Sequence, residues 1–202
     1  MEHRGRPCVH PESRADWRDW LAENHATSDG VWLVSWKVAT GRPRIPYDEV
    51  VEEALCVGWI DSLGNRLDDE RHLLLMTPRK PGSGWSRSNK LRVERLMAAG
   101  LMRPTGLAAV EAAVADGSWT ALDAVEDLVE PDDLAAALDA LPAARENWDG
   151  FSPSSRKGML QWIVTAKRPE TRARRIEQTV RLAAEGRRAN QPERKDPSAG
   201  SA

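Results

Sequence analysis

Hydrophobic and polar positions alternate in ways that predict both helices and strands in the first half of the chain. Residues 13–25 open with a capping box and then place apolar side chains at helical spacing, which predicts a short amphipathic helix. Residues 31–38 are rich in β-branched and aromatic side chains, which indicates a largely buried strand. Residues 48–57 again carry an apolar stripe at helical spacing, and Gly58 is placed to end that helix.

A second pair of strands follows directly. Residues 59–66 and 71–77 have the pattern of strands, and residues 67–70 between them have the composition of a turn. The economical arrangement is an antiparallel hairpin beside the first strand. We therefore expect an α+β fold, in which helices pack on a small three-stranded antiparallel sheet.

The second half of the chain has a helical pattern throughout. The predicted helices cover residues 107–116, 131–140, 142–149, 153–166 and 169–185, and a short turn is expected near 119–129. The last residues are polar and rich in Arg, Pro, Gly and Ser, which predicts disorder. The predicted organisation is a flexible leader at 1–12, an α+β domain at 13–106, a helical C-terminal module at 107–185 and a disordered tail at 186–202.

Charge is distributed unevenly along the chain, although the net charge is only −2. Residues 1–106 carry +1, residues 107–149 carry −10 and residues 150–202 carry +7. One interpretation is that the acidic helical stretch packs beside a basic helix and neutralises it. The other is that the basic helix contacts nucleic acid, although no recognition motif accompanies the charge.

The sequence lacks several features that would indicate export from the cytoplasm or a bound metal ion. No apolar run reaches the roughly 18–20 residues of a membrane-spanning helix, and the first residues lack the apolar segment of a signal peptide. A cytoplasmic location is therefore expected. Cys8 and Cys56 do not suggest a disulfide, and the four His and two Cys show no metal-ligand spacing. We expect no metal and no cofactor.

Several strings along the chain resemble a known family. They are Trp32-Leu33, Ala54 to Asp61 (ALCVGWID), Thr77 to Lys80, Trp85-Ser86 with Asn89, Gly100 to Met102, and Ala166-Lys167 with Glu170 to Arg172. Together they resemble the YdeI/OmpD-associated family, also described as bacteriocin-protection proteins, over roughly residues 12–185. The resemblance implies a bacterial protective or stress-type protein, and it implies no particular chemistry.

The loop from Pro78 to Asn89 is the best candidate for a binding site. Arg79, Lys80 and Arg87 surround two glycines, and the N–H groups of a new helix point outward, so the loop should attract anions. Trp85 offers a flat surface for a ring or a peptide side chain. The alternative is structural: Ser86 and Asn89 cap the helix, while Arg79 pairs with Asp61 or Asp68.

Lys37 and Asp61 are expected to join this site, because the predicted topology brings both toward Arg79. Buried charges need partners, so the three side chains should form one cluster. An Asp between two cations suits a structural anchor better than a general base. The predicted ligand-binding residues are Lys37, Asp61, Arg79, Trp85, Ser86 and Asn89.

A second candidate surface is the basic helix near the C-terminus. Its cations are Lys167, Arg168, Arg172, Arg174 and Arg175. Apolar residues such as Ile176 and Val180 follow helical spacing, so one face should dock and the other should stay solvated. Charge left exposed would bind RNA, an acidic partner or an anionic membrane surface.

Binding is favoured over catalysis. Cys56 lies in an apolar helix and has no identifiable base, so the sequence shows no nucleophile pair. The leading hypothesis is a cytosolic bacteriocin-protection or stress-type protein that binds a small anionic or peptide-derived ligand in a basic, Trp-lined cleft. Two alternatives remain open: an enzyme that uses the same cleft, and nucleic-acid or membrane-surface binding through the basic helix.

Overall fold

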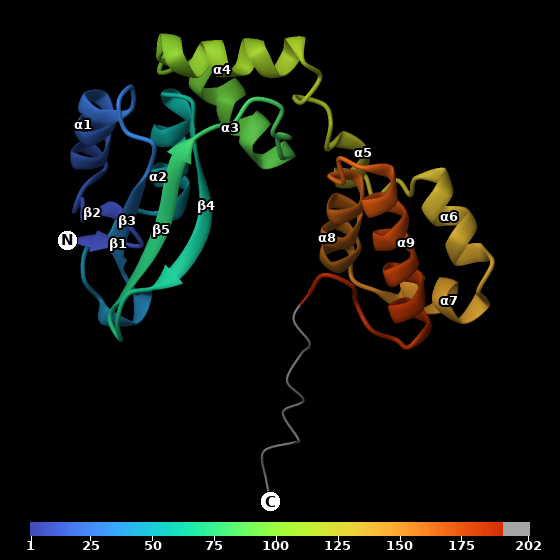
Figure 1. The fold of residues 1–202 in the computed structure, drawn as a ribbon. Coiled ribbons are helices and arrows are strands. Elements are labelled where there is room, and N and C mark those ends of the chain that lie inside the picture. Colours follow the sequence, from blue (N-terminus) through green and yellow to red (C-terminus); the bar gives the residue numbers. More distant parts are fainter. Residues whose placement is uncertain (192–202) are drawn as a thin grey trace, which may run out of the picture. The chain divides into compact units, whose positions relative to one another are not determined.

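The computed structural model describes residues 1–191, and the chain divides into two compact units (Figure 1). The first unit is Met1–Ala121 and the second begins at Leu122. Each unit has its own hydrophobic core. The sequence-based boundary after residue 106 falls inside the helix Pro104–Ala115, which lies in the first unit.

The first unit contains a five-stranded sheet in the order β1-β2-β3-β5-β4. Its strands are β1 (Glu2–His3), β2 (Arg6–Val9), β3 (Val31–Trp36), β4 (Trp59–Arg66) and β5 (Arg71–Pro78). Neighbouring strands are antiparallel except for β2 and β3, which run parallel. Its helices are α1 (Arg14–Asn24), α2 (Tyr47–Cys56), α3 (Arg87–Ala98) and α4 (Pro104–Ala115), with a 3-10 turn η1 (Val38–Thr40).

The α+β class is confirmed, but the sheet has five strands where the sequence predicted three. The two additional strands come from residues 1–12, which were expected to be a flexible leader. Arg4 and Gly5 adopt positive φ angles of 50° and 74°, which turns the chain back between β1 and β2. Cys8 and Val9 then pair with β3, so this segment is anchored by the sheet.

One face of the sheet is covered by α1 and α2. Trp17 and Leu21 of α1 pack with Val50 and Ala54 of α2 against Leu33 of β3. The Trp17 indole N–H donates to the backbone oxygen of Val50 at 3.1 Å, so this buried polar group is satisfied. The capping box predicted at the start of α1 is present. These contacts fix α2 against the sheet and place its C-terminus beside β4.

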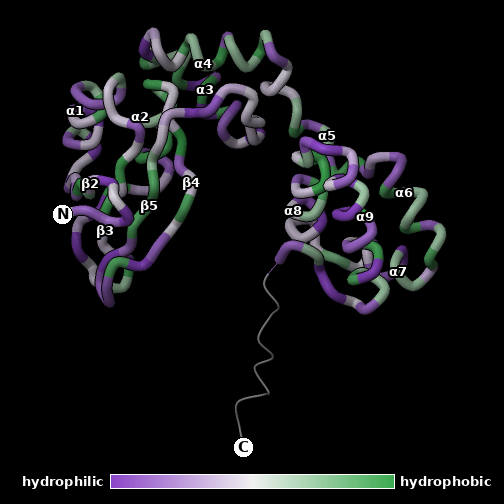
Figure 2. Tube along the Cα trace, in the orientation of Figure 1, coloured by the Kyte–Doolittle hydropathy of each residue, from purple (hydrophilic) through white to green (hydrophobic). Residues whose placement is uncertain are grey.

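The second unit is helical. Its helices are α5 (Asp123–Glu126), α6 (Asp132–Asp139), α7 (Pro142–Gly150), α8 (Pro153–Val164) and α9 (Pro169–Ala184). Helix α9 packs against α6, α7 and α8. Hydrophobic and hydrophilic positions alternate along α8 and α9 (Figure 2), and the hydrophobic ones include the buried Met159, Ile163 and Ile176.

The segment predicted as a disordered tail is described only in part. Residues 186–191 follow α9 as turns, with Ala189 fully buried. The side-chain amide of Gln191 donates to the backbone oxygen of Ser155 at 2.8 Å, which ties this segment to α8. Residues 192–202 lie outside the described part of the chain.

Two further findings concern the described residues as a whole. None of their helices combines the length and the apolar character required to cross a membrane. Cys8 and Cys56 are both free thiols.

Candidate functional site

Arg79 occupies the point where β5 ends and the loop to α3 begins. Its backbone N–H donates to the oxygen of Gly58 at 3.0 Å, which holds the loop against the end of α2. Its guanidinium lies over the Trp85 ring, 3.6 Å from the centroid, in a cation–π contact. The same group donates to the backbone oxygens of Gly84 at 3.0 Å and Ser83 at 3.4 Å. Arg79 therefore organises its own loop around a buried indole.

The Arg79 guanidinium forms no ion pair with any carboxylate of residues 1–191. Burial lowers the pKa of Arg79 to about 10, and the negative charge of Asp61 only partly opposes that effect. The side chain is still a cation at neutral pH. Partial removal of a cation from water without a counter-ion costs free energy, and an anion in contact with it would reduce that cost.

A small cavity of about 70 Å³ lies beside this guanidinium. Its lining comprises Arg79, Lys80, Pro81, Gly82, Ser83, Trp85, Ala109, Ala112, Ala113, Asp116 and Ser118. The Ser118 hydroxyl is buried and has no hydrogen-bond partner among the described residues. We call this space the Arg79 cavity. It combines a guanidinium that has no carboxylate partner with a hydroxyl that has no hydrogen-bond partner among the described residues.

Asp116 is the one carboxylate that lines the Arg79 cavity within the described chain, and backbone groups occupy both of its oxygens. One oxygen accepts from the N–H of Gly82 at 3.1 Å and the other from the N–H of Ser118 at 2.8 Å. The nearby Ser118 hydroxyl and these N–H groups lower the pKa of Asp116, although the hydroxyl does not reach hydrogen-bond geometry. Asp116 therefore links the loop between β5 and α3, through Gly82, to the C-terminal end of α4.

Ser86 and Asn89 act within α3 rather than in the cavity. The Ser86 hydroxyl is the N-cap and accepts from the Asn89 backbone N–H at 3.4 Å. The Asn89 side-chain oxygen accepts from Arg92 at 2.8 Å. Neither residue lines the Arg79 cavity. For these two residues the geometry is that of the capping alternative.

Lys37 and Asp61 are also directed elsewhere. The Lys37 ammonium donates to the backbone oxygens of Asp68 and Asp69, both at 2.9 Å. Because Trp36 pairs with the first residue of β5 and Arg79 follows its last, Lys37 lies at the opposite end of the sheet. Asp61 accepts from the Tyr47 hydroxyl at 2.8 Å. The predicted Lys–Asp–Arg cluster does not form.

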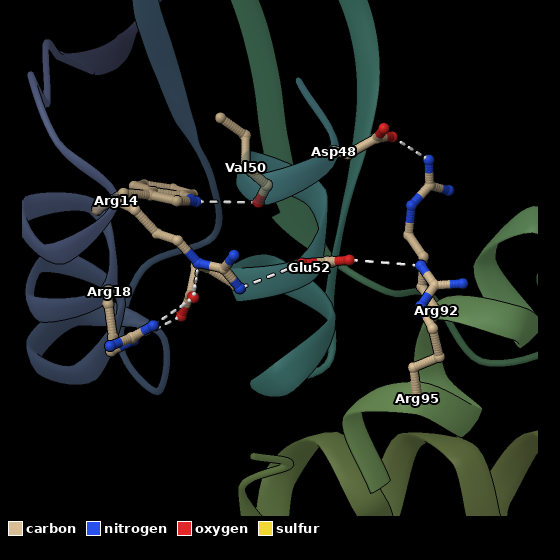
Figure 3. A network of polar contacts seen from close by, with 9 residues as sticks. Arg14, Arg18, Asp48, Val50, Glu52, Arg92 and Arg95 are labelled. Carbon is tan, nitrogen blue, oxygen red and sulfur yellow. Dashed lines mark hydrogen bonds and ion pairs between the residues drawn. The ribbon is translucent and has the colours of Figure 1, made fainter. Parts of the chain in front are cut away.

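An ionic network on α2 was not anticipated from the sequence (Figure 3). Glu53 is buried and accepts from Arg14 at 2.5 Å and from Arg18 at 2.7 and 2.8 Å. Burial raises the pKa of Glu53, but the two arginines outweigh it and the net pKa lies below the ordinary value. Glu52 bridges Arg14 and Arg95. The network joins α1 and α3 to α2.

Cys56, at the end of α2, is not an activated nucleophile. Burial, and then the nearby charge of Glu53, raises the pKa of its thiol to about 11. The thiol is therefore protonated at neutral pH. No group of three or more His, Cys, Asp and Glu side chains within residues 1–191 is arranged to hold a metal ion.

The basic helix α9 is partly neutralised inside the second unit. Arg172 pairs with Asp133 of α6 at 2.7 Å. Arg175 donates to the backbone oxygen of Trp162 and lies 5.0 Å from the centre of that ring. The remaining predicted cations, Lys167, Arg168 and Arg174, are exposed. Packing of the acidic helix α6 against the basic helix α9 thus neutralises part of the positive charge of α9.

Comparison with known proteins gives two family matches. Residues 9–109, half of the chain, match the model described as Domain of unknown function (DUF8412). Residues 127–186 match the model described as Bacteriocin-protection, YdeI or OmpD-Associated. The resemblance to the latter family is confirmed over that C-terminal part. No curated protein and no solved structure matches the chain.

Proposed function

This chain belongs to the family described as Domain of unknown function (DUF8412), and from that premise we propose that its first unit binds a small oxyanion in the Arg79 cavity. The contacts would come from Arg79, Lys80 and Ser118, with Trp85 as the floor beneath the guanidinium. The observation that carries the proposal is the partly buried Arg79 guanidinium, which has no carboxylate partner among residues 1–191.

The size and donors of the cavity suit one oxyanion group. A volume of about 70 Å³ exceeds the roughly 30 Å³ that one water occupies in the liquid. Guanidinium groups hold phosphate and carboxylate with two parallel hydrogen bonds, and such charge-assisted bonds are stronger than neutral ones. Lys80 is exposed at the mouth and adds a second positive charge. The oxyanion is either free or the carboxylate at the end of a peptide.

The match of residues 127–186 to a bacteriocin-protection model supports a protective role for the whole chain. A binding function is favoured over an enzyme because the cavity lining holds no nucleophile paired with a base. Asp61, the earlier candidate base, is held by Tyr47 and does not line the cavity.

Calorimetric titration of the full-length protein with inorganic phosphate tests the proposal. Arg79→Met should abolish measurable binding. Ser118→Ala should weaken binding about tenfold, as expected for one lost hydrogen bond to a charged ligand. Phosphate should also raise the melting temperature of the wild type, because it binds only the folded state. Triglycine and its C-terminal amide, titrated in parallel, distinguish a peptide carboxylate from a free anion.

Arg174→Met is the matched control, since it removes an exposed arginine from the other unit. It should bind phosphate as the wild type does. Equal phosphate affinity in the Arg79→Met and Arg174→Met proteins, or no binding of any of these anions by the wild type, would refute the proposal.

A further inference from the structure

A larger groove lies elsewhere in the first unit, between α1, the end of α2 and the loop from α3 to α4. Its volume is about 630 Å³, within the range of roughly 300–1,000 Å³ typical of small-molecule sites. The walls are mainly apolar and include Leu21, Val57, Leu101 and Met102. No residue of this groove lines the Arg79 cavity. We call it the α1–α4 groove.

The charged groups that line the α1–α4 groove leave it positive. Arg103 is exposed and forms no ion pair within residues 1–191. Arg18 binds Glu53, yet 48% of its side chain remains accessible. Glu53 is the only acidic residue in the lining, and its charge is already shared between Arg18 and Arg14. An anionic group is therefore favoured at the Arg103 end.

The start of α4 adds a hydrogen-bond donor at the same end. Pro104 and Thr105 line the groove, and the Arg103 side chain does not cap the helix. The backbone N–H of Thr105, which lines the groove, has no acceptor among the described residues. Such a free N–H group, together with the helix dipole, favours a negative charge at this position.

Cys56 contributes to the apolar wall of the groove. It lines the groove with 6% of its surface exposed, and the rest of the residue is packed in the core with Val51, Leu55 and Trp85. Gly106 holds the start of α4 directly against Cys56, because a Cβ at Gly106 would lie 2.3 Å from the Cys56 backbone oxygen. An apolar wall, the exposed cation Arg103 and the first residues of α4 therefore line one space.

We propose that the α1–α4 groove binds a carboxylic acid with an apolar body. The carboxylate lies at Arg103 and the free N–H at the start of α4. The apolar body lies along Leu21, Val57 and Met102. This site is separate from the Arg79 cavity, and neither proposal depends on the other.

Octanoate is the probe, and octan-1-ol is its uncharged counterpart. The full-length protein is labelled at the methionine methyl groups, of which the chain has five. The Met102 methyl signal should shift saturably with octanoate, while Met159, buried in the second unit, should not shift. Octanol should bind more weakly at the same position. Absence of a saturable Met102 shift would overturn the proposal.

Two variants test the carboxylate contact and the apolar part of the groove separately. Arg103→Glu should raise the octanoate Kd by about tenfold or more, the scale of one lost charge contact, and leave octanol binding unchanged. Ala22→Trp, at an exposed position of the lining, should prevent binding of both. Met159 shifts that match the wild type establish that each variant retains its second unit, and Met76 shifts do so for the first.

Two controls complete the experiment. Arg174→Glu reverses an exposed charge in the other unit and should leave the octanoate Kd unchanged. Arg79→Met should also leave it unchanged, even if phosphate binding is lost. If octanoate and octanol bind equally well and Arg103→Glu affects neither, the groove does not recognise a carboxylate and the proposal is wrong.

Discussion

At the scale of single residues, the surroundings of Tyr47 and Arg79 change their ionisation. Tyr47 is 51% exposed; its partial burial, and then the hydrogen bond to Asp61, raises the pKa of the phenol from 10.0 to about 12. Burial lowers the pKa of Arg79 to about 10. Both shifts favour the neutral form, as expected where charge loses its hydration. Only Arg79 is charged at neutral pH, so it contributes a desolvated cation to its cavity.

Tyr47 allows a direct test at this scale, because it is the only tyrosine in the chain. Tyrosinate absorbance of the folded protein should rise with a midpoint near pH 12, against 10.0 for an unshifted tyrosine. The folded state keeps the phenol proton to higher pH, so the free energy of unfolding should fall as pH rises through this interval. Asp61→Asn should lower the midpoint. A midpoint near 10 in protein shown to be folded by circular dichroism would contradict the described environment.

Local sequence predicted part of the candidate site. Arg79 and Trp85 are close in sequence, and a loop with two glycines brings them into contact. Ser118 was not predicted, because it reaches the cavity through the packing of α4, and no pattern near residue 118 marks it. Lys37 was misplaced because strand register, which the sequence does not give, decides which end of the sheet it occupies.

At the scale of elements, the close approach of α4 to α2 determines the shape of the α1–α4 groove. Gly106 permits that approach, since its missing side chain leaves room for the backbone oxygen of Cys56. The backbone N–H of Arg103 also donates to the Cys56 oxygen at 2.8 Å. The end of one helix is thereby bonded to the start of the other.

Gly106→Ala should destabilise the protein, although alanine is favoured over glycine in a helix by about 1 kcal/mol. The new Cβ would lie 2.3 Å from the Cys56 oxygen and 2.9 Å from the Leu55 oxygen, and backbone atoms cannot move aside easily. We expect a net loss of about 1–3 kcal/mol in urea unfolding, the usual cost of overpacking. Gly150→Ala, which meets nothing within 4 Å, is the control and should not destabilise. Stability equal to the wild type for Gly106→Ala would contradict this packing.

The elements themselves were largely predictable. Periodicity located β3, β4, β5 and the longer helices of both units, because each of these elements buries apolar side chains at a regular spacing. The strands β1 and β2 were missed, since they span only two and four residues and include Arg6 and Pro7. Their pairing is a tertiary property of the sheet and leaves little local signal.

At the scale of the whole molecule, the family matches and the structural units agree. The match over residues 9–109 falls within the first unit and the match over 127–186 falls within the second. Both proposed sites lie in the first unit. The acidic and basic segments partly neutralise each other within the second, through Arg172 and Asp133. Both proposals therefore place ligand binding in the first unit.

The central claim is that an oxyanion occupies the Arg79 cavity, and an anomalous difference map of crystals grown with selenate tests it most directly. A selenium peak is predicted in that cavity, placed so that selenate oxygens lie within hydrogen-bond distance of both the Arg79 guanidinium and the Ser118 hydroxyl. A map without a peak in that cavity, with Arg79 turned into an ion pair with Asp61 or Asp116, would contradict the claim.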